Sequence, residues 1–191
     1  TLDQVDKAHA HELANNLDIQ QNLQSGKKLT HLPCVMLSER SYGHCLGPLL
    51  IIQSLQIKNL DYQQLRRLFT HYLNTRQLCD DLHDWYEDFT AKRLTSVTRY
   101  LFMTSNLFPR AAQNQTQKIF WHEGLTQALT NTKYELQQAT SSLRAVKWTA
   151  HEPIRLAKTL QRFKQAITDA EKERKTSQAL LTHYETTYEP I

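Results

Sequence analysis

The stretch from residue 61 to residue 89 contains neither glycine nor proline, the two residues that most often interrupt a helix. Its apolar residues recur at the spacing of one helix face: Leu65, Leu68, Phe69, Tyr72 and Leu73. Asp61 stands where a helix N-cap is expected. The chain has only four Gly and five Pro among 191 residues, and it shows no alternating run typical of a strand. These features predict an all-α fold.

We expect one all-α domain over residues 1–191, because a chain of this length can bury a substantial core. The predicted helices cover residues 1–17, 41–57, 61–89, 94–106, 114–146 and 152–185. Loops are expected at residues 24–29 and 106–115. Pro153 is predicted in the first turn of the last helix, where its missing N–H costs nothing.

A dense acidic segment ends the third predicted helix. Residues 80–88 hold five of the 19 acidic residues of the chain. On a helix, Asp80, Asp84 and Asp88 share one face, and each like-charge pair costs roughly 0.2–0.5 kcal/mol. Arg76 lies one turn before Asp80 on that face. A bound cation would offset the repulsion, so the segment is a candidate cation site. A solvated or ion-paired helix face is the alternative.

The sequence of residues 76–93 resembles the second aspartate-rich motif of the class I isoprenoid synthase superfamily. Asp80-Asp81-x-x-Asp84 is similar to the second DDxxD of chain-elongating polyprenyl diphosphate synthases. The spacing of Asp80, Asp84 and Asp88 also matches the metal triad of terpene cyclases, which usually carry Ser or Thr and Glu at the later positions.

A third branch of the superfamily offers a longer match. Asp84-x-x-Glu87-Asp88 followed by Arg93 is similar to the squalene and phytoene synthase pattern D-x-x-E-D-x-x-x-G-R. The sequence departs from that pattern at Lys92, where the pattern has Gly. Upstream, the segment from residue 40 to residue 49 resembles the Gly-broken helix that lines the substrate pocket in this superfamily.

The resemblance implies an all-α bundle similar to the C-terminal part of the class I isoprenoid synthase fold. It also implies Mg²⁺-dependent chemistry on an allylic isoprenoid diphosphate, with prenyl transfer and terpene cyclisation both open. The implied metal ligands are Asp80, Asp84, Asp88 and Asp81. The implied diphosphate contacts are Arg93, Lys92, Arg76 and Arg40. The implied pocket residues are Gly43, Gly47 and Tyr72.

Only one acidic motif is present, whereas the superfamily pairs two on facing helices. The resemblance therefore implies that this chain is the C-terminal portion of a longer enzyme and supplies one metal-binding face. The facing helices would come from its upstream half, from another chain or from a second copy in a homodimer. The alternative is a synthase-like helical partner subunit that does no chemistry.

Charge and composition exclude some other classes. A net charge of +4, scattered along the chain, does not favour nucleic-acid binding. No run of 18 apolar residues is present, so no transmembrane segment is expected. Cys34, Cys45 and Cys79 are odd in number and lack metal-ligand spacing, which favours reduced thiols in a cytoplasmic protein. Peripheral contact with a membrane stays open.

Overall fold

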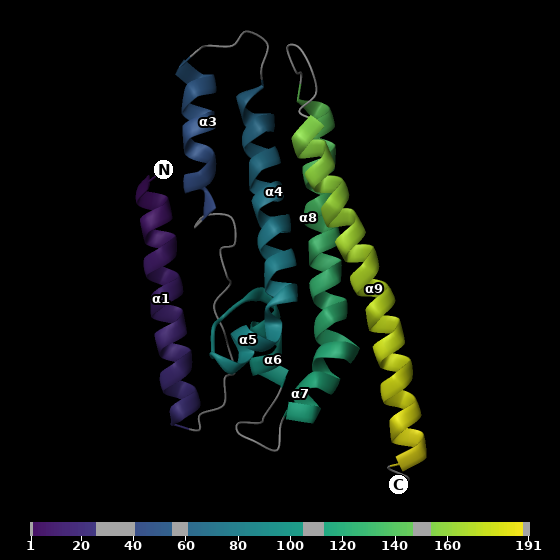
Figure 1. The fold of residues 1–191 in the computed structure, drawn as a ribbon. Helices are drawn as coiled ribbons and strands as arrows, with labels where there is room; N and C mark the ends of the chain where they lie inside the picture. The colour runs from purple at the N-terminus through teal and green to yellow at the C-terminus, as the bar shows by residue number, and fades with distance from the viewer. Residues whose placement is uncertain (1, 26–40, 55–60, 105–112, 147–153, 189–191) are drawn as a thin grey trace.

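The computed structural model describes residues 2–25, 41–54, 61–104, 113–146 and 154–188 (Figure 1). These residues are helical apart from short turns and contain no strand, which confirms the all-α prediction. The described elements are α1 (Leu2–Gln24), α3 (Gly43–Ser54), α4 (Tyr62–His83), α5 (Trp85–Thr90), α6 (Ser96–Thr104), α7 (Gln113–Ile119), the π-helix η1 (Phe120–Gly124), α8 (Leu125–Ala145) and α9 (Ile154–Tyr188).

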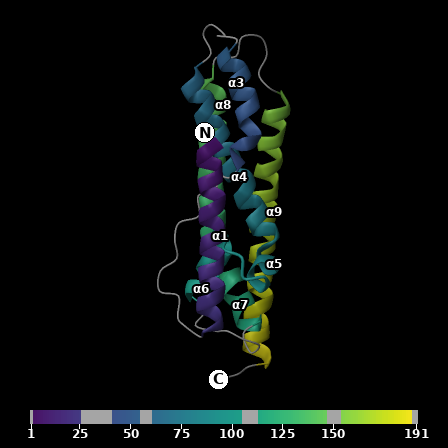
Figure 2. The ribbon, with the colours of Figure 1, turned by 90° about the vertical axis from the view of Figure 1, so that its left-hand side faces the viewer.

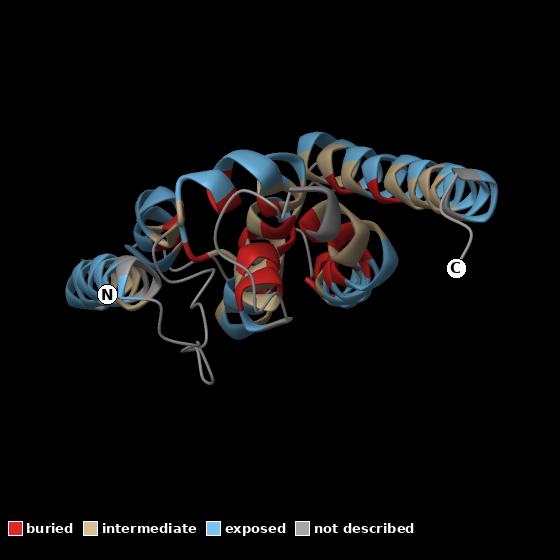
Figure 3. Cartoon of the chain, turned by 90° about the horizontal axis from the view of Figure 1, so that it is seen from below, coloured by how far each residue is buried: buried red, intermediate tan, exposed pale blue. Residues whose placement is uncertain are grey.

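Helices α4 and α8 form the centre of the molecule. They run antiparallel and make the most extensive helix–helix contact in the described chain, and α9 packs along α8 and part of α4 (Figure 1). Their apolar faces meet those of α6 and η1 in one core, whose fully buried members include Leu65, Leu68, Leu101 and Phe120. Viewed from below, the buried residues concentrate on the central helices, whereas α1 and the outer side of α9 are exposed (Figure 3).

Helices α1 and α3 lie on the side of α4 away from α9, with α3 above α1 (Figure 2). A hydrogen bond ties α1 down, because the Asn16 side-chain oxygen accepts from the Leu94 N–H at 2.6 Å. Helix α3 buries Cys45 and Leu49 but leaves Leu50 and Ile51 about 60 % exposed. No described helix, α3 included, is long and apolar enough to cross a membrane.

The predicted helix over residues 61–89 is wrong in one respect, because it divides at Asp84. Helix α4 ends at His83, Asp84 has φ −95° and ψ 10°, and α5 follows. Asp has low helix propensity, and like charges one turn apart weaken a helix further. The predicted N-cap is confirmed, since Asp61 Oδ1 accepts from the Gln63 and Gln64 N–H groups at 3.0 and 3.1 Å.

The predicted helix over residues 114–146 is also interrupted. The π-helix η1 separates α7 from α8 and turns Phe120 into the core, where its ring stacks on Trp85 at 3.8 Å. A π turn adds one residue relative to α-helical spacing, and apolar periodicity alone does not reveal it.

The largest shift of a helix boundary is in α1, which continues seven residues past the predicted end, to Gln24. The other boundaries shift by a few residues, as in α9, which runs to Tyr188. Several predicted positions lie outside the described residues: 55–57, 105–106, and 152–153, Pro153 among them.

Candidate functional site around the acidic segment

Asp80 and Asp84 are the solvent-facing carboxylates of the predicted metal set. Both residues are exposed, and the side chain of Asp80 is 58 % accessible. The Asp84 N–H donates to the Asp80 carbonyl at 2.9 Å, and the Asp88 N–H donates to the Asp84 carbonyl at 2.9 Å. The backbone therefore keeps the predicted one-turn spacing across the break between α4 and α5.

Asp81 faces inward and is only 3 % exposed. Its Oδ2 accepts from the Ser96 N–H at 3.0 Å and from the Ser96 hydroxyl at 2.8 Å, and its Oδ1 accepts from the Gln77 amide at 2.7 Å. These bonds satisfy a donor at the start of α6, where a carboxylate also interacts favourably with the helix dipole. Oδ2 thus joins α4 to α6, whereas Oδ1 is bound within α4.

Asp88 is also buried, on the short helix α5. Its Oδ1 accepts from Arg93 Nη1 at 3.3 Å, while the Arg93 side chain stays 65 % exposed. The Arg93 N–H donates to the Asp88 carbonyl at 2.8 Å, and Lys92 between them has φ 55°. This is the Schellman arrangement that ends many helices and places its left-handed residue, most often Gly, at the position of Lys92.

The carboxylates influence one another. Partial burial raises the pKa of Asp80; Arg76, whose Nε lies 3.9 Å from Asp80 Oδ2, lowers it, and the charges of Asp81 and Asp84 raise it further. Burial likewise raises the pKa of Asp88, against the hydrogen bond from Arg93, with Asp81 and Asp84 again adding repulsion. Burial is thus the main cause of both raised pKa values, and repulsion from the neighbouring carboxylates adds to it.

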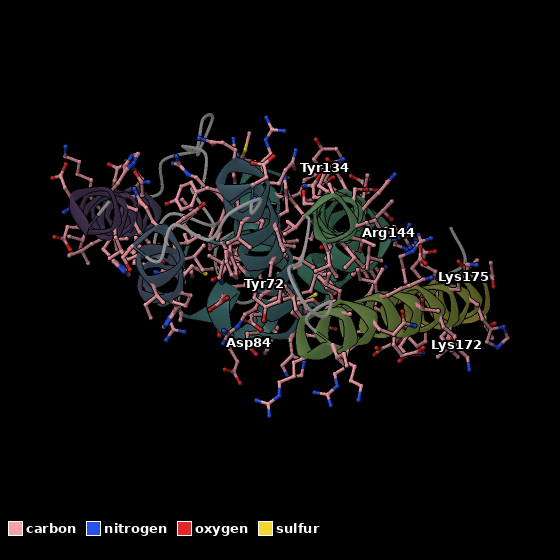
Figure 4. The ribbon with its side chains drawn as sticks, turned by 90° about the horizontal axis from the view of Figure 1, so that it is seen from above. Tyr72, Asp84, Tyr134, Arg144, Lys172 and Lys175 are labelled. Atoms are coloured by element: carbon pink, nitrogen blue, oxygen red, sulfur yellow. The ribbon has the colours of Figure 1, made fainter. Side chains whose placement is uncertain are left out.

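The predicted pocket residues do not gather around the carboxylates. Gly43 and Gly47 are exposed on α3, where an added Cβ would meet no described atom within 4 Å. Tyr72 is half-buried and packs its ring 5.9 Å from that of Phe163 on α9. Viewed from above, Tyr72 and Asp84 project toward the same edge of the bundle (Figure 4). Arg40 lies outside the described residues.

The donor set around Asp80 fits Mg²⁺ as a partial site. Mg²⁺ in proteins commonly takes one or two carboxylates and completes its shell with phosphate oxygens and water. Asp80 and Asp84 supply two solvent-facing carboxylates, whereas Asp81 and Asp88 are committed to internal hydrogen bonds. Within the described chain, no three His, Cys, Asp or Glu side chains are grouped as metal ligands.

A polar network between α4 and α8 was not predicted from the sequence. Glu135 Oε2 accepts from the Asn74 amide at 3.0 Å and lies 2.7 Å from His71 Nδ1. The Asn74 Oδ1 is buried without a hydrogen-bond partner. Glu135 is a single acidic residue on a helix whose buried face is apolar or Thr and Ser, and that contrast is the one signal that could have identified it.

A groove of about 740 Å³ between α8 and α9 was not predicted either. Its floor is formed by aliphatic side chains such as Leu136, Leu160 and Ile167, and Arg144 and Lys164 lie at its rim. This groove lies on helices other than those that carry the acidic segment.

Two cysteines, Cys45 and Cys79, lie within the described residues, and burial raises the pKa of both thiols. Cys45 and Cys79 are unpaired, and burial followed by the charge of Asp80 raises the pKa of Cys79 to about 11. Cys34 lies outside the described residues.

Comparison of the chain with protein-family models, with curated proteins and with solved structures yields no match. The functional argument therefore depends on the site residues themselves.

Proposed function

We propose that this chain supplies one carboxylate-bearing helical face of a Mg²⁺-dependent site for an allylic diphosphate, as the C-terminal half of a class I isoprenoid synthase does. The observation that carries the proposal is the exposed pair Asp80 and Asp84, one helical turn apart, with Arg76 beside it. Among the described residues, no base forms an ion pair with Asp84. Two exposed carboxylates one turn apart along the backbone, one of them without an ion-pair partner, are what supports a divalent cation here.

The backbone at Lys92 gives independent support. The squalene and phytoene synthase pattern has Gly at this position, and Lys92 is the one described non-glycine residue with a positive φ. A left-handed backbone at this point is what would favour Gly in such a pattern. The local structure therefore agrees with the resemblance at the position where the sequence departs from it.

Each residue then has a chemical task in the proposed site. Asp80 and Asp84 hold the metal, whose bound charge helps to neutralise the departing diphosphate. Arg76 and the exposed guanidinium of Arg93 are within the same segment and suit charge-assisted contacts to phosphate oxygens. Asp81 and Asp88 position the segment through Ser96 and Arg93.

The proposed site needs a facing wall. An allylic cation must be shielded from water, and Asp80 is more than half exposed. The facing helices would come from an upstream half of the same enzyme or from another chain. Whether the site then performs prenyl transfer or cyclisation depends on pocket depth.

A second candidate is a synthase-like helical partner without catalysis. Its support is that two of the four implied metal ligands, Asp81 and Asp88, already have structural tasks. In this case the acidic segment would bind a cationic surface of another protein, with no diphosphate.

Thermal unfolding with Mg²⁺ and inorganic diphosphate tests the proposal. The two together should raise the melting temperature more than either alone, and saturation at a hundred times Kd is worth about 2.7 kcal/mol. The double variant D80A/D84A should lose the effect. The control Asp18→Asn removes an exposed carboxylate from α1 and should keep it. Equal shifts for wild type and D80A/D84A would exclude Asp80 and Asp84 as ligands.

Activity separates the two candidates. With the facing half present, diphosphate should be released from an allylic substrate such as geranyl diphosphate, and D80A/D84A should abolish the release. A complex that forms normally, binds Mg²⁺ and diphosphate, and turns over no allylic diphosphate would favour the non-catalytic partner.

A further inference from the structure

The outward side of α9 carries charges in a defined order. Residues spaced three or four apart lie on one exposed stripe, defined here as the α9 stripe: Arg155, Lys158, Arg162, Gln165, Ala166, Asp169, Glu173, Thr176 and Leu180. Its first half is basic and its centre is acidic. Within the described chain, no ion pair joins these charges to another element, and Asp169 accepts only from the neighbouring Gln165 amide at 3.0 Å.

When a second α9 helix runs in the opposite direction, its charges are complementary to those of the first. If two α9 helices lie antiparallel with a two-fold axis between Gln165 and Ala166, Arg162 faces Asp169 of the second copy. In the same register Lys158 faces Glu173. The symmetry repeats both contacts, so four opposite-charge pairs form, and no like charges of the stripe face each other.

The same register covers two exposed aliphatic side chains. Ile154 and Leu180 are 64 % and 65 % exposed, the highest values among the large apolar residues of the described chain. In the antiparallel register Ile154 comes within one helical turn of Leu180 of the second copy, at both ends of the contact. Apolar contacts at the ends would therefore flank the central charge pairs.

We propose that the α9 stripe is a self-association surface, through which two copies of this chain pair antiparallel. Helix α9 has 35 residues, roughly 50 Å in length, and its outer side is exposed along this length (Figure 3). A two-fold contact is isologous, so it closes at the dimer and does not extend into a filament. The surface is separate from the acidic segment and does not depend on the proposed function.

The contact predicts a salt-dependent dimer. Exposed ion pairs weaken as salt screens them, so sedimentation velocity should show dimer in 50 mM NaCl and a shift toward monomer in 500 mM NaCl. A monomer at both salt concentrations, with protein at several hundred micromolar, would overturn the proposal.

Charge reversal tests the register. Arg162→Glu and Asp169→Arg each place like charges opposite one another, so each should weaken dimerisation at least tenfold. The double variant R162E/D169R restores opposite charges in the same register and should restore the dimer. Both substitutions are on the surface, and circular dichroism of the three variants would verify that the fold is retained.

Lys175 provides the matched control. It is exposed on α9 (labelled in Figure 4), and the 3.6-residue helix repeat puts it on a different face from the stripe. Lys175→Glu changes the charge by the same amount as Arg162→Glu and should leave the dimer intact. A loss of dimer in Lys175→Glu equal to that in Arg162→Glu would show that net charge, not register, controls association. Failure of R162E/D169R to recover the dimer would exclude the antiparallel contact.

Discussion

Lys92 has an unfavourable backbone conformation for a residue with a Cβ. A left-handed conformation costs a non-glycine residue roughly 1–2 kcal/mol. Substitution by Gly removes this cost, but part of the gain is lost because Gly has greater conformational freedom in the unfolded chain. Lys92→Gly should therefore stabilise the protein by about 1 kcal/mol in chemical denaturation. Lys92→Ala is the control, because it removes the same side chain but keeps the Cβ. A gain of similar size in Lys92→Ala would assign the effect to the side chain.

Asp81 should be the acidic residue on which folding depends most. Its three hydrogen bonds reach Ser96 and Gln77, and its removal leaves the Ser96 N–H at the start of α6 without this acceptor. Asp81→Ala should cost about 2 kcal/mol in the free energy of unfolding, measured in urea. Asp80→Ala, next to it but exposed, should change stability by less than about 0.5 kcal/mol. Similar losses in both variants would contradict the distinction between an inward and an outward carboxylate.

At the scale of the element, the carboxylate of Asp84 repels those of Asp80 and Asp88 at the junction of α4 and α5. Asp84 raises the pKa of both Asp80 and Asp88, so at neutral pH its charge destabilises the segment. Without a bound cation, Asp84→Asn should stabilise the protein by about 0.5 kcal/mol at pH 7. Glu87→Gln, an equal charge change at a residue that raises neither pKa, should give a smaller gain.

The pH dependence follows from the direction of these pKa shifts. The pKa values of Asp80 and Asp88 are higher in the folded than in the unfolded chain. Their contribution to the free energy of unfolding is therefore fully present below the unfolded pKa of about 3.9, and it is lost as the pH rises through the folded pKa values. The gain from Asp84→Asn should accordingly disappear at pH 3, where protonation of Asp80 and Asp88 removes the repulsion. Thermal melts of wild type and Asp84→Asn from pH 3 to pH 7 would measure this stability difference. A difference that is constant across this range would rule out charge repulsion as its cause.

Sequence periodicity predicted the helices well where one face is consistently apolar. The predicted N-cap at Asp61 is confirmed. Asp80, Asp84 and Asp88 keep one-turn spacing along the backbone, but Asp88 is buried whereas Asp80 and Asp84 are exposed, so the three do not share one solvent-facing surface. What the sequence did not predict depends on tertiary contact. Asp81 points inward to Ser96, fifteen residues away, and Phe120 at the π turn stacks on the ring of Trp85. Neither contact leaves a periodic signal.

At the scale of the whole molecule, the outer face of α3 remains apolar and uncovered. Leu50 and Ile51 should be replaceable by Ser with a change in stability below about 0.5 kcal/mol, because neither is buried. The same double variant should bind less of a hydrophobic dye and stay soluble at higher concentration. Leu49→Ser, one residue away but 3 % exposed, should cost about 3 kcal/mol. A large loss of stability in the double variant would mean that α3 packs on both sides.

The π turn at residues 120–124 should tolerate substitutions better than insertions or deletions. Deleting one residue there would restore an unbroken α-helix and rotate α7 by roughly 100° relative to α8. Thr116, now buried, would then leave the interior, and the Phe120 ring would lose its stack on Trp85. Among proteins that share this fold, substitutions within the turn should therefore be common where the side chains are exposed, as at His122. Insertions and deletions of one residue should be rare.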